Sequence, residues 1–179
     1  NETQTNRKPL VFLSGVSGSG KTALARYFAE KQSVDISRLD PRRKNIANDT
    51  QMLAISFDAN TSVNEYDKKW IAEGKSQLLV IARLLFRQSA ATPMFDTFCK
   101  YFDSALTNNK LDNEQIDLNI VLATICDADK PAILIVDELS KLQRLGGTEL
   151  VEDMRHRLCG WMDAAWSRFF VLFTTLHTG

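Results

Sequence analysis

Residues 15–22 leave this chain few choices of fold. They match the pattern G-x-x-x-x-G-K-[ST] at every required position, with Gly15, Val16, Ser17, Gly18, Ser19, Gly20, Lys21 and Thr22. An apolar run, 10–13, precedes the motif, and a segment of helical character, 23–28, follows it. A loop of this kind functions between a strand and the N-terminus of a helix, so this context predicts an α/β fold built around a buried strand.

The residue types of the loop suit the binding of nucleoside phosphates. Glycines allow a tight turn whose consecutive N–H groups point at phosphate oxygens, and the start of the helix adds partial positive charge. We expect Lys21 to reach the β- and γ-phosphates and the Thr22 hydroxyl to hold a magnesium ion. The alternative is a Gly/Ser turn that only joins strand to helix, but such a turn has no need of a lysine followed by a threonine.

The composition is that of an ordinary soluble globular domain. Hydrophobic residues make up 44% and charged residues 25% of the 179 residues, and the formal net charge is zero. This balance gives no argument for a nucleic-acid partner, which stays undetermined, and without an apolar run of transmembrane length we expect no membrane insertion. We expect a polar N-terminal segment, 1–9, and one domain, 10–179, as a segment of a longer protein.

The cysteines argue against a zinc site or a disulfide framework. Cys99, Cys126 and Cys159 lie far apart, form no C-x-x-C pair and are accompanied by only two histidines in the sequence. Buried free thiols in a reducing intracellular environment are therefore the expectation.

Apolar runs alternate with helical patterns along the chain. Strands are predicted at 10–14, 52–58, 132–136 and 169–173, and helices at 21–31, 76–87, 93–106, 117–126 and 148–166, the last after a break at Gly146-Gly147. Strands that are continuously apolar and alternate with helices predict a mainly parallel sheet with helices on both faces, which makes three layers.

Asp137 and Glu138 close the third predicted strand and match the Walker B pattern. In this pattern the aspartate assists the magnesium ion, and the glutamate that follows orients and polarises a water for attack on the γ-phosphate. Because ligands bind beyond the carboxyl ends of parallel strands, this tip is expected to share an edge with the phosphate loop. An acidic strand end that merely meets solvent is the alternative.

Two strings bear on the choice between ATP and GTP. Residues 137–140 read Asp-Glu-Leu-Ser and so lack the D-x-x-G of a GTPase. Residues 109–112 spell the guanine-reading N-K-x-D, but they come before the Walker B strand, and no strand precedes them. We therefore expect ATP.

Thr174 and Thr175 end the last predicted strand. In P-loop ATPases with an additional strand between the Walker A and Walker B strands, a polar residue at this point senses the γ-phosphate; a threonine that caps the strand end is the alternative. No arginine finger is evident. Arg155, Arg157 and Arg168 are candidates, and a second copy of the chain that supplies the arginine through self-association is an equal alternative.

Beyond the Walker motifs, several segments resemble the NTPase domain of Crinkler-type effectors and of the related retrotransposon hot spot proteins. The resemblance covers about residues 10–176 and is carried by Gly-Val-Ser-Gly-Ser-Gly-Lys-Thr, the polar-ended strand 55–60, the run Ala82-Arg83-Leu84-Leu85 and the segment 134–142. It implies a three-layer P-loop NTPase fold and places Gly15, Lys21, Thr22, Asp137 and Glu138 in the nucleotide site. It also implies an ATPase module of a secreted protein that acts in the host cell nucleus.

The leading hypothesis is an ATPase that hydrolyses ATP to ADP and phosphate with Mg2+. Lys21, Glu138, Thr174 and Thr175 would form its catalytic set, and Thr22 and Asp137 would hold the metal. One alternative is a nucleotide-dependent conformational switch with little turnover. A less favoured one is a small-molecule kinase, which would need an Arg-rich lid after the Walker B strand.

Overall fold

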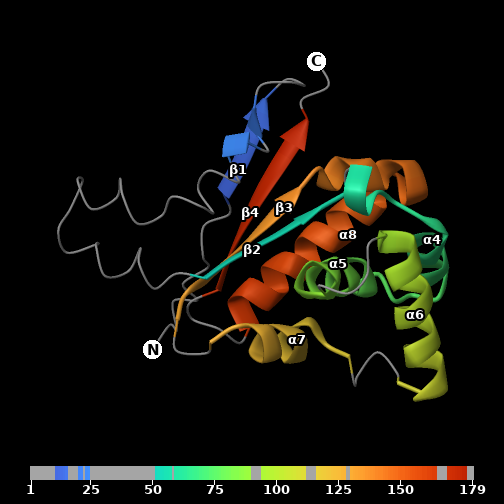
Figure 1. The fold of residues 1–179 in the computed structure, drawn as a ribbon. Helices are drawn as coiled ribbons and strands as arrows, with labels where there is room; N and C mark the ends of the chain where they lie inside the picture. The colour runs from blue at the N-terminus through green and yellow to red at the C-terminus, as the bar shows by residue number, and fades with distance from the viewer. Residues whose placement is uncertain are drawn as a thin grey trace, which may run out of the picture.

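The computed structural model describes residues 11–15, 20, 21, 23, 24, 51–57, 59–89, 94–111, 116–127, 130–164 and 169–176. Its strands form one parallel, four-stranded sheet in the order β1-β4-β3-β2 (Figure 1). The strands are β1 (Val11–Gly15), β2 (Gln51–Ser56), β3 (Ala132–Asp137) and β4 (Phe169–Leu176). The predicted α/β class with a parallel sheet is thus confirmed.

The last strand of the chain lies in the middle of the sheet. β4 pairs with β1 on one side, where Leu13 stands opposite Thr174, and with β3 on the other, where Val136 stands opposite Phe173. β4 therefore separates the strand that ends in Gly15 from the strand that ends in Asp137, which is the position expected for the additional strand.

The described helices lie together on one side of the sheet (Figure 1). They are η2 (Ala59–Thr61), α4 (Glu65–Ala72), α5 (Leu78–Gln88), α6 (Phe95–Asn108), α7 (Leu118–Ile125), η3 (Leu139–Leu142) and α8 (Gln143–Ala164). α5 packs on β2, and α8 packs on β4. Of the helix predicted at 21–31, only Lys21, Ala23 and Leu24 are described, so helices on the second face stay a prediction. Within the described ranges, no helix combines the length and apolar character needed to cross a bilayer.

The boundaries of the elements differ from the predicted ones in a few places. β2 ends at Ser56 rather than 58, and α6 begins at Phe95 rather than 93. The predicted helices do not include α4. A signal was present, because Asn64 and Asp67 form a capping box in which each side chain accepts the other residue's backbone N–H.

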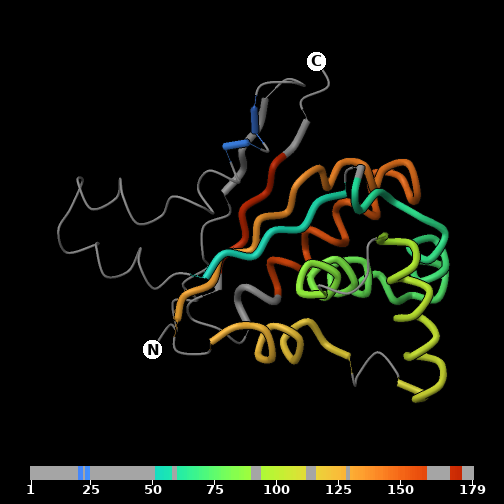
Figure 2. The backbone as a smooth tube through the Cα atoms, viewed as in Figure 1, coloured from blue at the N-terminus to red at the C-terminus, as the bar shows by residue number. Residues whose placement is uncertain are grey.

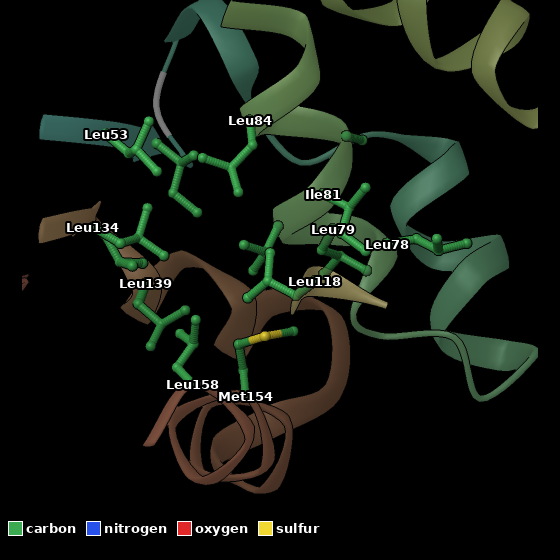
Figure 3. Close-up of a cluster of buried hydrophobic side chains, with 14 of the residues drawn as sticks. Leu53, Leu78, Leu79, Ile81, Leu84, Leu118, Leu134, Leu139, Met154 and Leu158 are labelled. Carbon is green, nitrogen blue, oxygen red and sulfur yellow. The ribbon is translucent and has the colours of Figure 1, made fainter. Parts of the chain in front are cut away.

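The core lies between the sheet and this helical layer (Figure 3). Leu53 and Leu134 enter it from neighbouring strands, the leucines of α5 cover them, and Met154 and Leu158 close it from α8. Leu150, Met154 and Leu158 are all buried, as their spacing predicts. Apolar burial of this extent is the main source of stability in such a domain.

The cysteines behave as buried thiols where the structure describes them. Cys99 and Cys126 are free and buried, and Cys159 is free and half-buried. Burial raises the pKa of Cys99 to about 11 and also raises the pKa of Cys126. Because the thiolate is the reactive form, burial makes both thiols less reactive than an exposed cysteine.

The predicted break at Gly146-Gly147 is a kink inside α8, since three helical residues already precede it. Gly147 has φ 68° and ψ −166°, a region that side chains rarely occupy, although a Cβ there would meet nothing within 4 Å. We expect Gly147→Ala to lower the free energy of unfolding by about 1–3 kcal/mol. The matched change Gly160→Ala, in open space on the same helix, is expected to raise it by up to about 1 kcal/mol. Urea unfolding measures both, and equal effects would contradict the strain at Gly147.

Candidate functional site

The carboxyl ends of the four parallel strands meet at one edge of the sheet. Gly15 ends β1, Ser56 ends β2 and Asp137 ends β3, while Thr174 lies close to the end of β4. Figure 2 shows β2, β3 and β4 running side by side toward this edge. In open α/β sheets, ligands bind outside the carboxyl ends of the strands, so this edge is the candidate site.

The phosphate-loop motif has the expected context at both of its ends. Gly15 is the last residue of β1, and Lys21 lies in a helical turn, where the Leu24 N–H donates to the Gly20 carbonyl at 2.7 Å. Gly20 has φ +77°, a left-handed conformation that favours glycine. The described residues on either side of the loop are thus a strand end and a helical turn, as the motif requires. Val16, Ser17, Gly18, Ser19 and Thr22 lie outside the described residues.

A single threonine hydroxyl of β4 contacts both Asp137, the last residue of β3, and Glu138, which follows it. The Thr174 hydroxyl donates to Asp137 Oδ1 and accepts the backbone N–H of Glu138 at 3.4 Å. Thr174 is fully buried, and Asp137 is 4% exposed. A buried carboxylate is costly unless it is hydrogen-bonded, so this bond helps to keep Asp137 at the edge of the sheet. Thr175 is described only by its backbone, which pairs with Ser14.

Glu138 has an uncommon backbone conformation. Its φ of 60° and ψ of 35° are left-handed, which costs a residue other than glycine about 1–2 kcal/mol. Glu138 Oε2 is buried and lies 3.1 Å from Lys141 Nζ, in an ion pair whose geometry is not that of a hydrogen bond. Strain of this kind concentrates at functional sites, which makes the turn after Asp137 a candidate for one.

On the other side of β3, the end of β2 completes the edge. Ser56 stands opposite Asp137 in the register, and the Phe57 N–H donates to the Asp137 carbonyl at 3.1 Å. The Thr61 hydroxyl donates to the Ser56 carbonyl at 2.5 Å. Ser56, Asp137 and Thr174 thus bring side-chain oxygens to three neighbouring strand ends. Ser56 is not among the predicted site residues, although the polar end of its strand is a signal in the sequence.

The acidic and hydroxyl groups at this edge fit a magnesium ion that is bound partly by the protein and partly by a phosphate. In the part of the chain that the structure describes, no group of three or more His, Cys, Asp or Glu side chains could hold a metal by itself. Mg2+ is usually bound by one or two carboxylates together with substrate phosphates rather than by an all-protein cage. The Asp137 carboxylate, which the Thr174 hydroxyl orients, has the chemistry of such a donor.

The candidate arginine fingers of α8 are engaged on their own helix. Arg155 pairs with Glu152, and Arg157 Nε lies 2.8 Å from Asp153 Oδ2. Arg168 lies outside the described residues. The N-K-x-D string begins at Asn109, directly after α6, so a helix and not a strand precedes it, as expected. The contacts that Arg155 and Arg157 make thus lie along α8.

Compared with protein-family models, with curated proteins and with solved structures, the chain matches none. Any function for this edge is therefore argued from its own residues. These are the glycines and lysine after β1, the Asp137–Thr174 bond, the strained Glu138 and the end of β2.

Proposed function

We propose that this chain is a P-loop ATPase domain that hydrolyses ATP to ADP and phosphate with Mg2+. One observation carries the proposal: β4, whose Thr174 hydrogen-bonds to Asp137, lies between the strand that ends in Gly15 and the strand that ends in Asp137. Walker A, additional and Walker B strands occur in this order in P-loop ATPases that carry the extra strand. The proposal includes the three-layer P-loop NTPase fold.

The phosphates of ATP would bind at the end of β1. We assign their binding to the backbone amides of the loop motif, and the Lys21 ammonium would add charge-assisted hydrogen bonds to the β- and γ-phosphates. Thr22 and Asp137 would hold Mg2+, which supplies positive charge against the charge that develops on the transferred phosphoryl group. In this proposal the loop binds the phosphates, while the end of β3 positions the metal ion at the γ-phosphate.

Glu138 is the proposed general base. Its carboxylate accepts a hydrogen bond from the attacking water and draws negative charge onto the water oxygen. Thr174 keeps the Asp137 carboxylate in place and aligns the Glu138 backbone through the second bond of its hydroxyl. Sensing of the γ-phosphate is assigned to Thr174 and Thr175, because both lie at the end of the strand between the two motifs.

A nucleotide-dependent switch with little turnover is the second candidate. The observation that favours it is the ion pair between Glu138 and Lys141, which engages the proposed base within its own turn. In this case ATP binding would change which partner Glu138 contacts, and hydrolysis would be incidental. The resemblance to Crinkler-type effectors is compatible with both candidates and adds the proposal of a secreted protein that acts in a host nucleus.

Binding of Mg-ATP by wild type and Lys21→Ala tests the proposal. We expect saturable binding by the wild type and about 10- to 100-fold weaker binding by the variant, since a hydrogen bond to a charged group is lost. Lys68→Ala, which removes an exposed lysine of α4 paired with Glu65, is the matched control and should bind like the wild type. Isothermal titration gives the affinities, and equal binding by the Lys21 variant would refute the phosphate site.

Release of phosphate is followed in the same preparations with no acceptor added. Phosphate that appears from ATP and water alone would argue against a small-molecule kinase, because a kinase needs a second substrate to accept the phosphoryl group. Mg-ATP binding without any phosphate release would favour the switch.

A further inference from the structure

Arg83, in the middle of α5, is a charged side chain with no solvent exposure, and so is its partner Asp67 of α4. Arg83 Nη1 and Nη2 lie 2.9 and 2.7 Å from the two carboxylate oxygens of Asp67. Nε and Nη2 both donate to the Thr61 carbonyl, and Nη1 donates to the Leu79 carbonyl. All five N–H donors of the guanidinium are thereby used.

Stability alone does not account for this arrangement. Replacing a buried ion pair by apolar side chains of similar volume is often neutral or stabilising, because two charges must be removed from water to form the pair. The guanidinium also lies over the ring of Phe57, with 4.2 Å between its carbon and the ring centroid, and 4.8 Å from the ring centroid of Phe95. A group this completely surrounded fixes the relative positions of everything that it contacts.

The contacts of Arg83 lead to the carboxyl edge of the sheet by two short routes. Thr61, whose carbonyl accepts from Arg83, donates its hydroxyl to the Ser56 carbonyl. Phe57, whose ring packs on the guanidinium, donates its N–H to the Asp137 carbonyl. Arg83 thus contacts the turn after β2 at its first residue, Phe57, and at its last, Thr61. This turn lies next to Asp137.

We propose that Arg83, with Asp67, is a positioning residue for the reaction of the site: it sets the end of β2 against Asp137. This inference rests on the proposed ATPase function. The phosphate loop follows β1, and β4 and β3 lie between β1 and β2. Loss of the Arg83 contacts should therefore reduce the turnover number while leaving the binding of ATP by the loop intact.

The double variant Arg83→Met/Asp67→Leu removes both charges and keeps apolar volume in their place. It avoids the unpaired buried carboxylate that Arg83→Met alone would leave, so it is the variant in which the fold is preserved. We expect kcat for ATP hydrolysis to fall about 10-fold or more, with KM within about twofold of wild type, since displacements of about 1 Å at a reacting centre have large kinetic effects.

Lys69→Met/Asp103→Asn is the matched control. Lys69 is on α4, as Asp67 is, and its ammonium lies 2.7 Å from Asp103 on α6. An asparagine at 103 still has an oxygen to accept the Trp70 indole N–H. This pair links α4 to α6 rather than to the end of β2, so kcat and KM are both expected to equal those of wild type.

Hydrogen exchange separates this inference from the proposed function. In the Arg83/Asp67 double variant we expect faster exchange of the Phe57 amide, whose acceptor is Asp137, and unchanged exchange within the middle of β3. Turnover equal to wild type, or Phe57 exchange equal to wild type, would overturn the positioning role while the ATPase stands. A wild type that neither binds nor hydrolyses ATP would refute the proposed function itself, and the exchange data would still show whether Arg83 holds the turn.

Discussion

Glu138→Gln is expected to lower the rate of ATP hydrolysis by about 100-fold or more while Mg-ATP binding stays within about twofold of wild type. Glutamine keeps the size and shape of the side chain but is not a base, so it cannot take a proton from the attacking water. The phosphate loop after β1 is untouched, which is why affinity should persist. Steady-state phosphate release and isothermal titration measure the two quantities.

Glu149→Gln provides the control for this change. It makes the same substitution at an exposed position of α8, a few residues along the chain and after the kink at Gly146-Gly147. Its turnover should equal that of the wild type. If Glu138→Gln also hydrolysed ATP at the wild-type rate, the carboxylate would have no catalytic role, and the conformational switch would become the better account of the site.

The parts of the structure that the sequence could predict depend on local patterns. The continuous apolar run before Asp137 needs burial on both faces, which makes it a strand of a parallel sheet. The glycines and the lysine of residues 15–21 require a strand before them and a helix after them; the strand β1 is present, and the described residues after it, Lys21, Ala23 and Leu24, are helical. The position of Thr174 on a strand between the two motifs was expected only from the known strand order of P-loop ATPases, because no local sequence pattern determines the order of strands in a sheet.

What the sequence could not predict depends on contacts between distant residues. An arginine in an amphipathic helix usually points to solvent, and nothing near Arg83 in the sequence reveals that Asp67 and the Thr61 carbonyl will enclose it. Nothing in the local sequence distinguishes Ser56 from any other serine at the end of a strand; only the register shows that it lies opposite Asp137. The strained backbone of Glu138 is likewise a consequence of the turn into η3, which only the fold defines.

The same burial makes Arg83 the position where a single substitution should destabilise the domain most. Arg83→Met leaves the Asp67 carboxylate in the core without its partner, and breaking a buried ion pair from one side costs about 3–5 kcal/mol. Adding Asp67→Leu removes the unpaired charge and should recover most of that loss, except for about 1 kcal/mol from the Asn64–Asp67 capping box, which it also removes. Urea unfolding followed by circular dichroism measures the free energy of unfolding of both variants.

Lys69→Met sets the scale for an ion pair that is not buried. Its side chain is 43% exposed, so the loss of its pair with Asp103 should cost less than about 1 kcal/mol. A loss of the same size for Arg83→Met would mean that water reaches Asp67 and that the pair is not sealed in the core. No recovery in the double variant would mean that the unpaired carboxylate is not the source of the loss. The decisive result is a double variant whose free energy of unfolding recovers while its turnover number does not. Such a variant would be folded and yet position Asp137 less accurately, which assigns the Arg83 contacts to the geometry of the site.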